Sequence, residues 1–107
     1  MYTPTKRDVK FWFDRINAEV FDHCLNPFSK IIIEHHDTEW GAMDPKDNGI
    51  LYLSTDFPDK DEFINVLAHE MVHQWQWQYA DICDHGTSFQ AWEGAMMAKN
   101  YLINYWF

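Results

Sequence analysis

The residues of this chain best suited to chemistry are two histidines and a glutamate within the sequence His69-Glu70-Met71-Val72-His73. On a helix, residues four apart lie on one face with about 5–6 Å between their Cβ atoms, so His69 and His73 can bind one metal ion together. Glu70 is rotated by about 100° around the helix axis from His69, which places it beside the metal and not on it. Two imidazoles that hold Zn²⁺, and a carboxylate that takes a proton from the bound water, are what a zinc hydrolase needs.

This motif requires a helix, and the run from Asp59 to Tyr79 predicts one. Asp59 is a suitable N-cap, and Glu62 follows three residues later, as in a capping box. No Gly or Pro interrupts the run, and its apolar residues fall on more than one side, as is typical of a helix buried within a domain. The alternative to a metal site is a pair of core histidines hydrogen-bonded to their neighbours. We favour the metal because a Glu occupies the second position of the motif.

The composition indicates one folded domain. The chain has 107 residues, enough for one hydrophobic core and too few for two, so we expect a single domain over residues 1–107. Hydrophobic residues make up 47% of the chain and aromatic residues 18%, which argues against disorder. The net charge of −9 argues against direct nucleic-acid binding, because such proteins usually carry a basic patch. The basic residues Lys6, Arg7 and Lys10 lie beside Asp8 and are interpreted as part of a solvated helix face.

The cysteines and the N-terminus bear on the cellular setting. Cys24 and Cys83 are far apart and form no Cys-x-x-Cys pair, so neither a disulfide framework nor a zinc ribbon is expected. A reducing, cytoplasmic setting is the default for such a chain. Residues 1–8 are polar and lack the apolar core of a signal peptide, and no apolar run approaches membrane-spanning length.

Two further helices are expected to flank the motif helix. Residues 5–24 carry apolar side chains at steps of three and four, which predicts an amphipathic helix that Asn26-Pro27 ends. A last helix is predicted from Ser88 to about Trp106. Thr87, with Gln90 three residues later, resembles a capping box for that helix.

A small sheet is expected between the first helix and the motif helix. Three strands are predicted, at residues 30–36, 40–43 and 50–54. The residues at 44–49 favour turns, so the last two strands should pair antiparallel. His35 and His36 are interpreted as the polar end of the first strand and not as metal ligands. Helices and a segregated sheet together predict an α+β fold.

A catalytic zinc site needs a third protein ligand besides a water. Beyond the motif the candidates are Cys83, Asp84, His85 and Glu93. His85 lies twelve residues after His73, where a reversal of the chain can bring it back to the helix, and Gly86 permits the tight backbone that this requires. Glu93 could ligate from the following helix, or it could orient a ligating imidazole. Cys83 is more simply a buried apolar residue.

At these residues the chain resembles the SprT-like (Spartan) metalloprotease domain. The resemblance rests on residues 67–75 and on His85-Gly86-Thr87-Ser88-Phe89. It continues upstream at Phe21, Asn26-Pro27-Phe28, Trp40-Gly41 and residues 50–54. The resemblance implies a zincin-like fold in which His69, His73 and His85 bind zinc and Glu70 is the catalytic base.

The activity that the resemblance implies is that of a zinc metalloendopeptidase acting on a protein or peptide substrate. Glu70 would take a proton from the zinc-bound water, which then attacks the peptide carbonyl. Candidates for stabilising the oxyanion are Tyr79, Tyr101 and Tyr105. The family's proteolysis of DNA-associated proteins is a further implication, although this acidic chain has no cysteines for the zinc ribbon that many members carry.

Two other functions remain open from the residues alone. The first is a non-enzymatic, zinc-stabilised acidic interaction domain that binds a basic partner or mimics nucleic acid. Glu70 argues against it, because a purely structural site needs no base. The second is a different His-Glu-x-x-His peptidase that uses Glu93 as its third ligand. The oligomeric state is not predicted.

Overall fold

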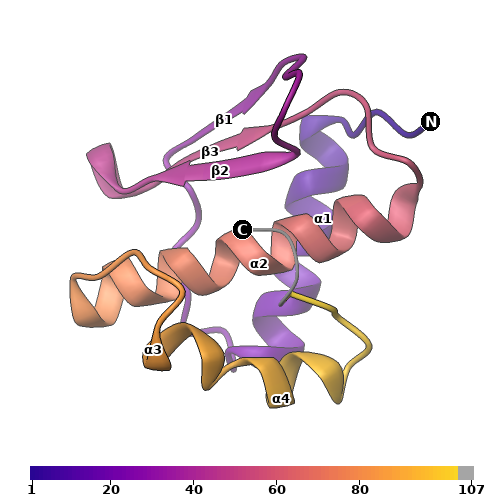
Figure 1. Cartoon of the computed structure of the whole chain (residues 1–107). Helices are drawn as coiled ribbons and strands as arrows, with labels where there is room; N and C mark the ends of the chain where they lie inside the picture. The colour runs from indigo at the N-terminus through magenta and orange to yellow at the C-terminus, as the bar shows by residue number, and fades with distance from the viewer. Residues whose placement is uncertain (104–107) are drawn as a thin grey trace.

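A three-stranded sheet packed on a long helix forms the frame of the protein, seen here in a computed structural model that describes residues 1–103 (Figure 1). In chain order the elements are α1 (Lys6–Val20), β1 (Lys30–Ile33), β2 (Gly41–Asp44), the 3₁₀ helix η1 (Lys46–Asn48), β3 (Ile50–Leu53), α2 (Lys60–Ala80), α3 (Thr87–Gln90) and α4 (Glu93–Met97). The sheet lies on one side of α2, and α3 and α4 lie on the other. The α+β class expected from the sequence is confirmed.

The sheet has the strand order β1-β3-β2. β2 and β3 pair antiparallel with Gly41 opposite Leu53, which confirms the pairing predicted from the turn residues between them. β1 instead pairs parallel to β3, a pairing that the sequence pattern did not indicate. β1 ends at Ile33 and not at His36, because its partner β3 ends at Leu53 and the last bond runs from the Glu34 N–H to the Leu53 carbonyl. Since β2 stands at one end of the strand order, it is an edge strand, and it packs against α2.

α2 is buried on every side along its middle. Its cap is the predicted one: the Asp59 carboxylate accepts a hydrogen bond from the Glu62 N–H at 2.9 Å. All twelve residues of 63–74 are buried, with the sheet above and α1 crossing behind. Burial around the whole circumference leaves no solvent-facing stripe, so every polar side chain on this stretch needs a partner within the protein.

α1 ends earlier than predicted. It is capped by Thr5 and Asp8, whose side chains bond each other's backbone N–H groups, and it ends at Val20 instead of continuing to residue 24. The Asn17 side chain accepts from the Leu25 N–H and donates to the Leu25 carbonyl, so it holds the chain in a reversal directly after the helix.

The single helix predicted from Ser88 to about Trp106 is wrong. The chain forms two short helices, α3 and α4, and then leaves helical geometry at Asn100, whose φ is +67°. The predicted Thr87–Gln90 capping box is also absent, since Gly86 is the N-cap and the Gln90 amide donates to the His85 carbonyl. The helical run ends in a local cap, with Asn100 in the left-handed conformation and the Tyr101 N–H donating to the Met96 carbonyl at 2.9 Å. The Leu102 N–H then donates to the Asn65 side chain on α2, which holds the chain after the cap against that helix. Tyr105 and Trp106 lie outside the described residues.

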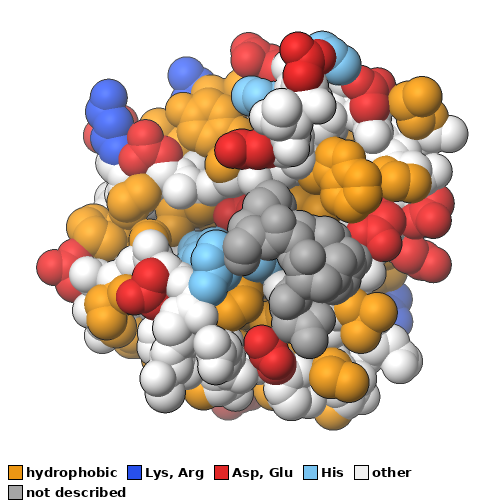
Figure 2. Space-filling model, in the orientation of Figure 1, with side chains coloured by type: hydrophobic (Ala, Val, Ile, Leu, Met, Phe, Trp, Pro, Cys, Tyr) orange, Lys and Arg blue, Asp and Glu red, His pale blue; other side chains and the backbone are white. Residues whose placement is uncertain are grey.

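The surface matches the acidic composition. The face in Figure 2 carries many more acidic side chains than lysines or arginines, and histidine side chains are visible near its centre.

No helix within residues 1–103 has the length and apolar content needed to cross a membrane.

Candidate metal centre

Three histidine side chains converge beside the edge strand β2. His69 and His73 come from adjacent turns of α2, and His85 comes from the loop between α2 and α3. The Nε2 atom of His85 lies 3.2 Å from the Nε2 atom of His69 and 3.2 Å from that of His73. A tetrahedral ion with Zn–N bonds of about 2.0–2.1 Å holds its ligand nitrogens about 3.3 Å apart. Both distances fit one such ion, and the ligand atoms of the three rings all lie within 4.8 Å of one another.

The other nitrogen of each motif histidine is occupied. The His69 Nδ1–H donates to the Ile103 carbonyl at 2.6 Å, and the His73 Nδ1 contacts the Gln76 side-chain oxygen at 2.8 Å. A carbonyl oxygen only accepts, so each of these nitrogens carries the proton. The Nε2 lone pairs of both rings are then directed toward the Nε2 atom of His85, 3.2 Å from each. A neutral imidazole that carries its proton on Nδ1 and has its lone pair on Nε2 is a form that binds a metal.

Burial keeps the motif histidines neutral. It is the main cause that lowers the pKa of His69 to about 3, and His73 and His85 lower it further by charge repulsion, while the Ile103 carbonyl acts in the opposite direction. Burial likewise lowers the pKa of His73. Neutral imidazoles are ready to ligate without first losing a proton.

Glu70 lies beside the histidines as a buried carboxyl group. Only 2% of the residue is exposed, and burial, followed by repulsion from Glu39, raises its pKa to about 8. Gly41 makes room for it: a Cβ there would lie 2.5 Å from Val66 Cγ1 and 3.4 Å from the Glu70 Oε2. The start of β2 thus packs directly on α2 and helps to bury the carboxyl group.

A cleft of about 240 Å³ is lined by the three histidines and by Glu70. One wall is β2, represented by Gly41, Ala42 and Met43, and the other is the loop that carries His85. β2 is thus both an edge strand of the sheet and a wall of this cleft.

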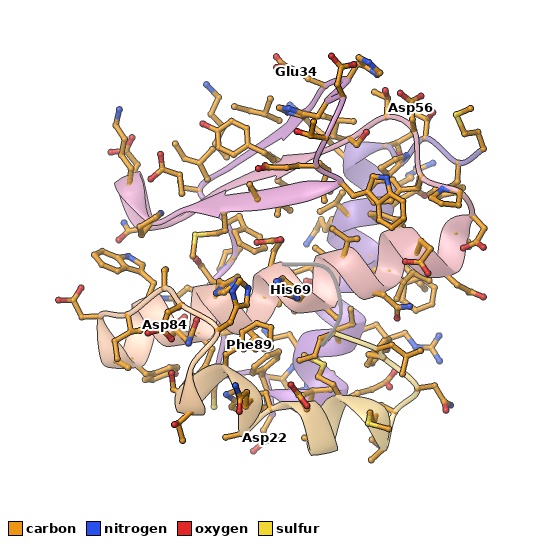
Figure 3. All side chains as sticks on the ribbon, viewed as in Figure 1. Asp22, Glu34, Asp56, His69, Asp84 and Phe89 are labelled. Carbon is orange, nitrogen blue, oxygen red and sulfur yellow. The ribbon has the colours of Figure 1, made fainter. Side chains whose placement is uncertain are left out.

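Phe89 of α3 supports all three rings from below. It is 2% exposed, and its ring centroid lies 4.7, 4.9 and 5.0 Å from those of His69, His73 and His85. Figure 3 shows Phe89 and His69 facing each other between α3 and α2, with Asp84 in the connecting loop. The sequence pattern marked Phe89 as core and as part of a family block, but it did not indicate this contact with the candidate ligands.

The other candidate third ligands lie elsewhere. Within residues 1–103, the group that could hold a metal comprises only the three histidines named above. The Asp84 carboxylate instead accepts hydrogen bonds from the Gly86 N–H and the Gln76 amide. Cys83 is exposed and not the buried residue that was expected. It lines the cleft, where partial burial raises the pKa of its thiol, and its Sγ contacts the His73 carbonyl. Glu93 lies on α4 outside the group.

Two of the tyrosines proposed as oxyanion donors are engaged away from the cleft, so that expectation is wrong for both. The Tyr79 hydroxyl donates to the Cys24 carbonyl at 2.7 Å, and the Tyr101 hydroxyl donates to Glu19 at 3.4 Å. Neither of them lines the cleft. The third candidate, Tyr105, falls outside the described residues.

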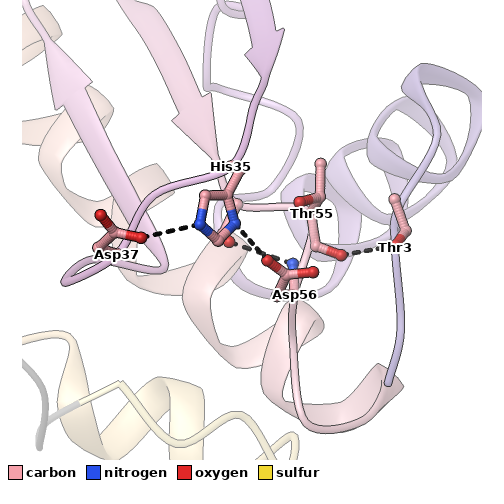
Figure 4. Close-up of polar contacts among 6 residues, drawn as sticks. Thr3, His35, Asp37, Thr55 and Asp56 are labelled. Atoms are coloured by element: carbon pink, nitrogen blue, oxygen red, sulfur yellow. Dashed lines mark hydrogen bonds and ion pairs between the residues drawn. The ribbon is translucent and has the colours of Figure 1, made fainter.

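His35 forms a separate cluster away from the metal centre (Figure 4). Its Nδ1 lies 2.5 Å from an Asp56 oxygen and its Nε2 lies 2.8 Å from an Asp37 oxygen. Hydrogen bonds to Asp56 and then Asp37 are the main causes that raise the pKa of this exposed imidazole. The three residues join the loop after β1 to the loop before α2.

The sequence model of the SprT-like family matches residues 9–104, and the chain belongs to this family. The matched range includes the motif on α2, the His85 loop and the edge strand β2. Membership indicates a metallopeptidase-like domain, and the three converging histidines could hold a metal ion. Comparison with curated proteins and with solved structures gives no match.

Proposed function

We propose that this protein is a zinc-dependent endopeptidase in which His69, His73 and His85 hold the metal and Glu70 is the general base. The observation that carries the proposal is the convergence of the three histidines next to a buried carboxyl group, with the His85 Nε2 atom 3.2 Å from the Nε2 atoms of both His69 and His73. Family membership supports the same chemistry. A purely structural zinc site does not need a carboxyl group held in this position.

Zinc, when bound, would supply an acidified water and a positive charge for the oxygen of the attacked carbonyl. Glu70 would accept the proton from that water and later deliver it to the leaving amine. Burial raises the pKa of Glu70, and a bound cation would lower it again. The balance of the two would leave an ionised carboxylate with a pKa near the working pH, which suits a general base.

The edge strand β2 is the proposed substrate platform. An extended peptide can add to an exposed sheet edge through backbone hydrogen bonds, with little dependence on its sequence. Such a peptide beside Gly41, Ala42 and Met43 would run along the cleft that the histidines line. The zincin-like arrangement proposed for this chain consists of the edge strand β2, the motif helix α2 and His85, which the loop after α2 brings back to that helix.

The cellular setting is proposed from the cysteines, and the substrate is proposed from the family. Cys24 and Cys83 are unpaired, which suits a reducing, cytoplasmic environment. Proteolysis of DNA-associated proteins is the substrate hypothesis taken from the family, and the net charge of −9 disfavours direct binding of the enzyme to DNA.

The test compares proteolysis by the wild type and by Glu70→Gln on a flexible, unfolded protein at matched zinc occupancy. Gln keeps the size of Glu and loses its basicity, so hydrolysis should fall by about 10²–10⁴-fold while zinc affinity and fold persist. The exposed Glu34, which directly follows β1, provides the control Glu34→Gln, which should cleave at the wild-type rate.

Two results would overturn parts of this proposal. A Glu70→Gln variant that cleaves as fast as the wild type excludes Glu70 as the base. A zinc-loaded wild type that cleaves no unfolded protein favours the alternative, a zinc-stabilised acidic interaction domain, for which the net charge of −9 is the supporting observation.

A further inference from the structure

Gln76 is a fully buried polar side chain one turn beyond His73 on α2. Its exposed fraction is 0%, although a buried amide is costly unless its hydrogen bonds are made. The side-chain oxygen contacts the His73 Nδ1 at 2.8 Å, and the side-chain nitrogen donates to the Ser88 hydroxyl at 2.8 Å and to the Asp84 carboxylate at 3.4 Å. Every polar atom of the amide is thus used, and each partner belongs to the centre or to the segment around His85.

The orientation of this amide follows from its partners. An ionised carboxylate accepts hydrogen bonds and donates none, so the NH₂ group must face Asp84 and the oxygen must face His73. His73 then has to carry its proton on Nδ1, which leaves the Nε2 lone pair directed at His69 and His85. Asp84 is itself held, since its Oδ1 accepts from the Gly86 N–H at 3.0 Å.

We infer that Gln76 is a positioning residue of the metal centre: it fixes the His73 tautomer and ties that ring to the turn that carries His85. The inference rests on the proposed metal site and adds to it the group that presets one ligand. For His69 the same task falls to the backbone carbonyl of Ile103, which a substitution cannot remove. Gln76 is therefore the side chain through which this orientation can be tested.

Gln74 offers a matched control on the same helix. It is 2% exposed, and its side-chain nitrogen donates to the backbone carbonyls of Asn26, Pro27 and Asn48, away from the histidines. Gln74→Met and Gln76→Met therefore remove the same buried amide from the same element. Only the second removes the acceptor from His73.

The first measurement is zinc affinity by competition with a chromophoric chelator. Loss of a group that orients a ligating histidine typically weakens metal binding by about 10–100-fold, and we expect this for Gln76→Met. Gln74→Met should bind zinc as tightly as the wild type. Equal affinities of the two variants would overturn the inference, because the loss of a buried amide would then explain any effect.

The second measurement reports the tautomer directly and needs neither metal nor activity. Long-range ¹H–¹⁵N correlation spectra of the metal-free protein should show His73 protonated on Nδ1 in the wild type and in Gln74→Met. Gln76→Met should show a mixture of both tautomers. Gln76→Glu retains an acceptor for Nδ1 and should keep the wild-type tautomer, which covers the case in which the Met variant does not fold.

These spectra separate the two hypotheses. If the wild type binds no zinc, the proposed function fails, and the His73 tautomer still decides the role of Gln76. A wild-type His73 protonated on Nε2, or loss of the Nδ1 tautomer in Gln76→Glu, would overturn the inference even in a protein that binds zinc.

Discussion

Zinc binding should produce a large rise in thermal stability, because the proposed ligands lie on two segments that only the folded chain brings together. His69 and His73 belong to α2, and His85 belongs to the loop that leads to α3. An ion that binds the native arrangement and not the unfolded chain stabilises the native state by mass action. The perturbation is complete removal of metal by a chelator, followed by titration with zinc.

The size of the effect can be worked out in two steps. At free zinc of about 100 times the dissociation constant, binding stabilises the native state by about 2.7 kcal/mol. For a domain of roughly 100 residues, each kcal/mol moves the melting temperature by about 4–8 °C. The chain has 107 residues, so the melting temperature should rise by about 10–20 °C.

The assay is differential scanning calorimetry at neutral pH on metal-free and zinc-titrated protein, with zinc content measured on the same samples. The matched control is His85→Ala, which lacks one proposed ligand and should gain much less stability at the same free zinc. A melting temperature that does not change on verified binding of one zinc per chain would refute the reasoning, since the ion would then not be held by the folded centre.

Three further predictions concern individual side chains. Equilibrium dialysis should show His85→Ala losing zinc far more readily than Glu93→Gln, and the reverse order would make Glu93 the third ligand. Phe89→Ala should lower the free energy of unfolding by about 3–5 kcal/mol, because a cavity replaces a buried ring that contacts three imidazoles. Urea titrations measure this change, and a loss near zero would show that the ring is not packed as described. The third prediction concerns pH. The aspartates around His35 raise its folded-state pKa above the unfolded value of about 6.5. The resulting stabilisation is complete below pH 6.5, about the unfolded pKa, and is lost as the pH rises through the folded-state pKa. His35→Gln should therefore lower the melting temperature near pH 6 and leave it unchanged near pH 9, and an equal loss at both pH values would contradict the ion-pair explanation.

Local patterns were sufficient where short-range chemistry decides the structure. The Asp59 cap and the absence of helix breakers specified α2, and its apolar residues on several sides indicated the burial that the structure shows. Turn residues between β2 and β3 specified their antiparallel pairing. The spacing of His69 and His73 placed both rings on one face of the helix. Each of these features depends on residues at most a few positions apart, so one sequence contains the information.

Pairings between distant segments needed the tertiary structure. The parallel pairing of β1 with β3 could not be predicted from periodicity, because a strand pattern does not specify its partner. His85 was one candidate among four until the family resemblance favoured it, since a loop residue can be brought back to the helix only by the path of the whole chain.

What the sequence determined by itself is the motif helix, the class of fold and the placement of the two motif histidines on one face of that helix. What only the tertiary structure decided is how those groups are held. The broken C-terminal helix is the clearest case: local spacing favoured one continuous helix, whereas the fold presents the Leu102 N–H to Asn65 and the Ile103 carbonyl to His69. These hydrogen bonds join residues more than thirty positions apart, and no pattern within a single element could reveal them.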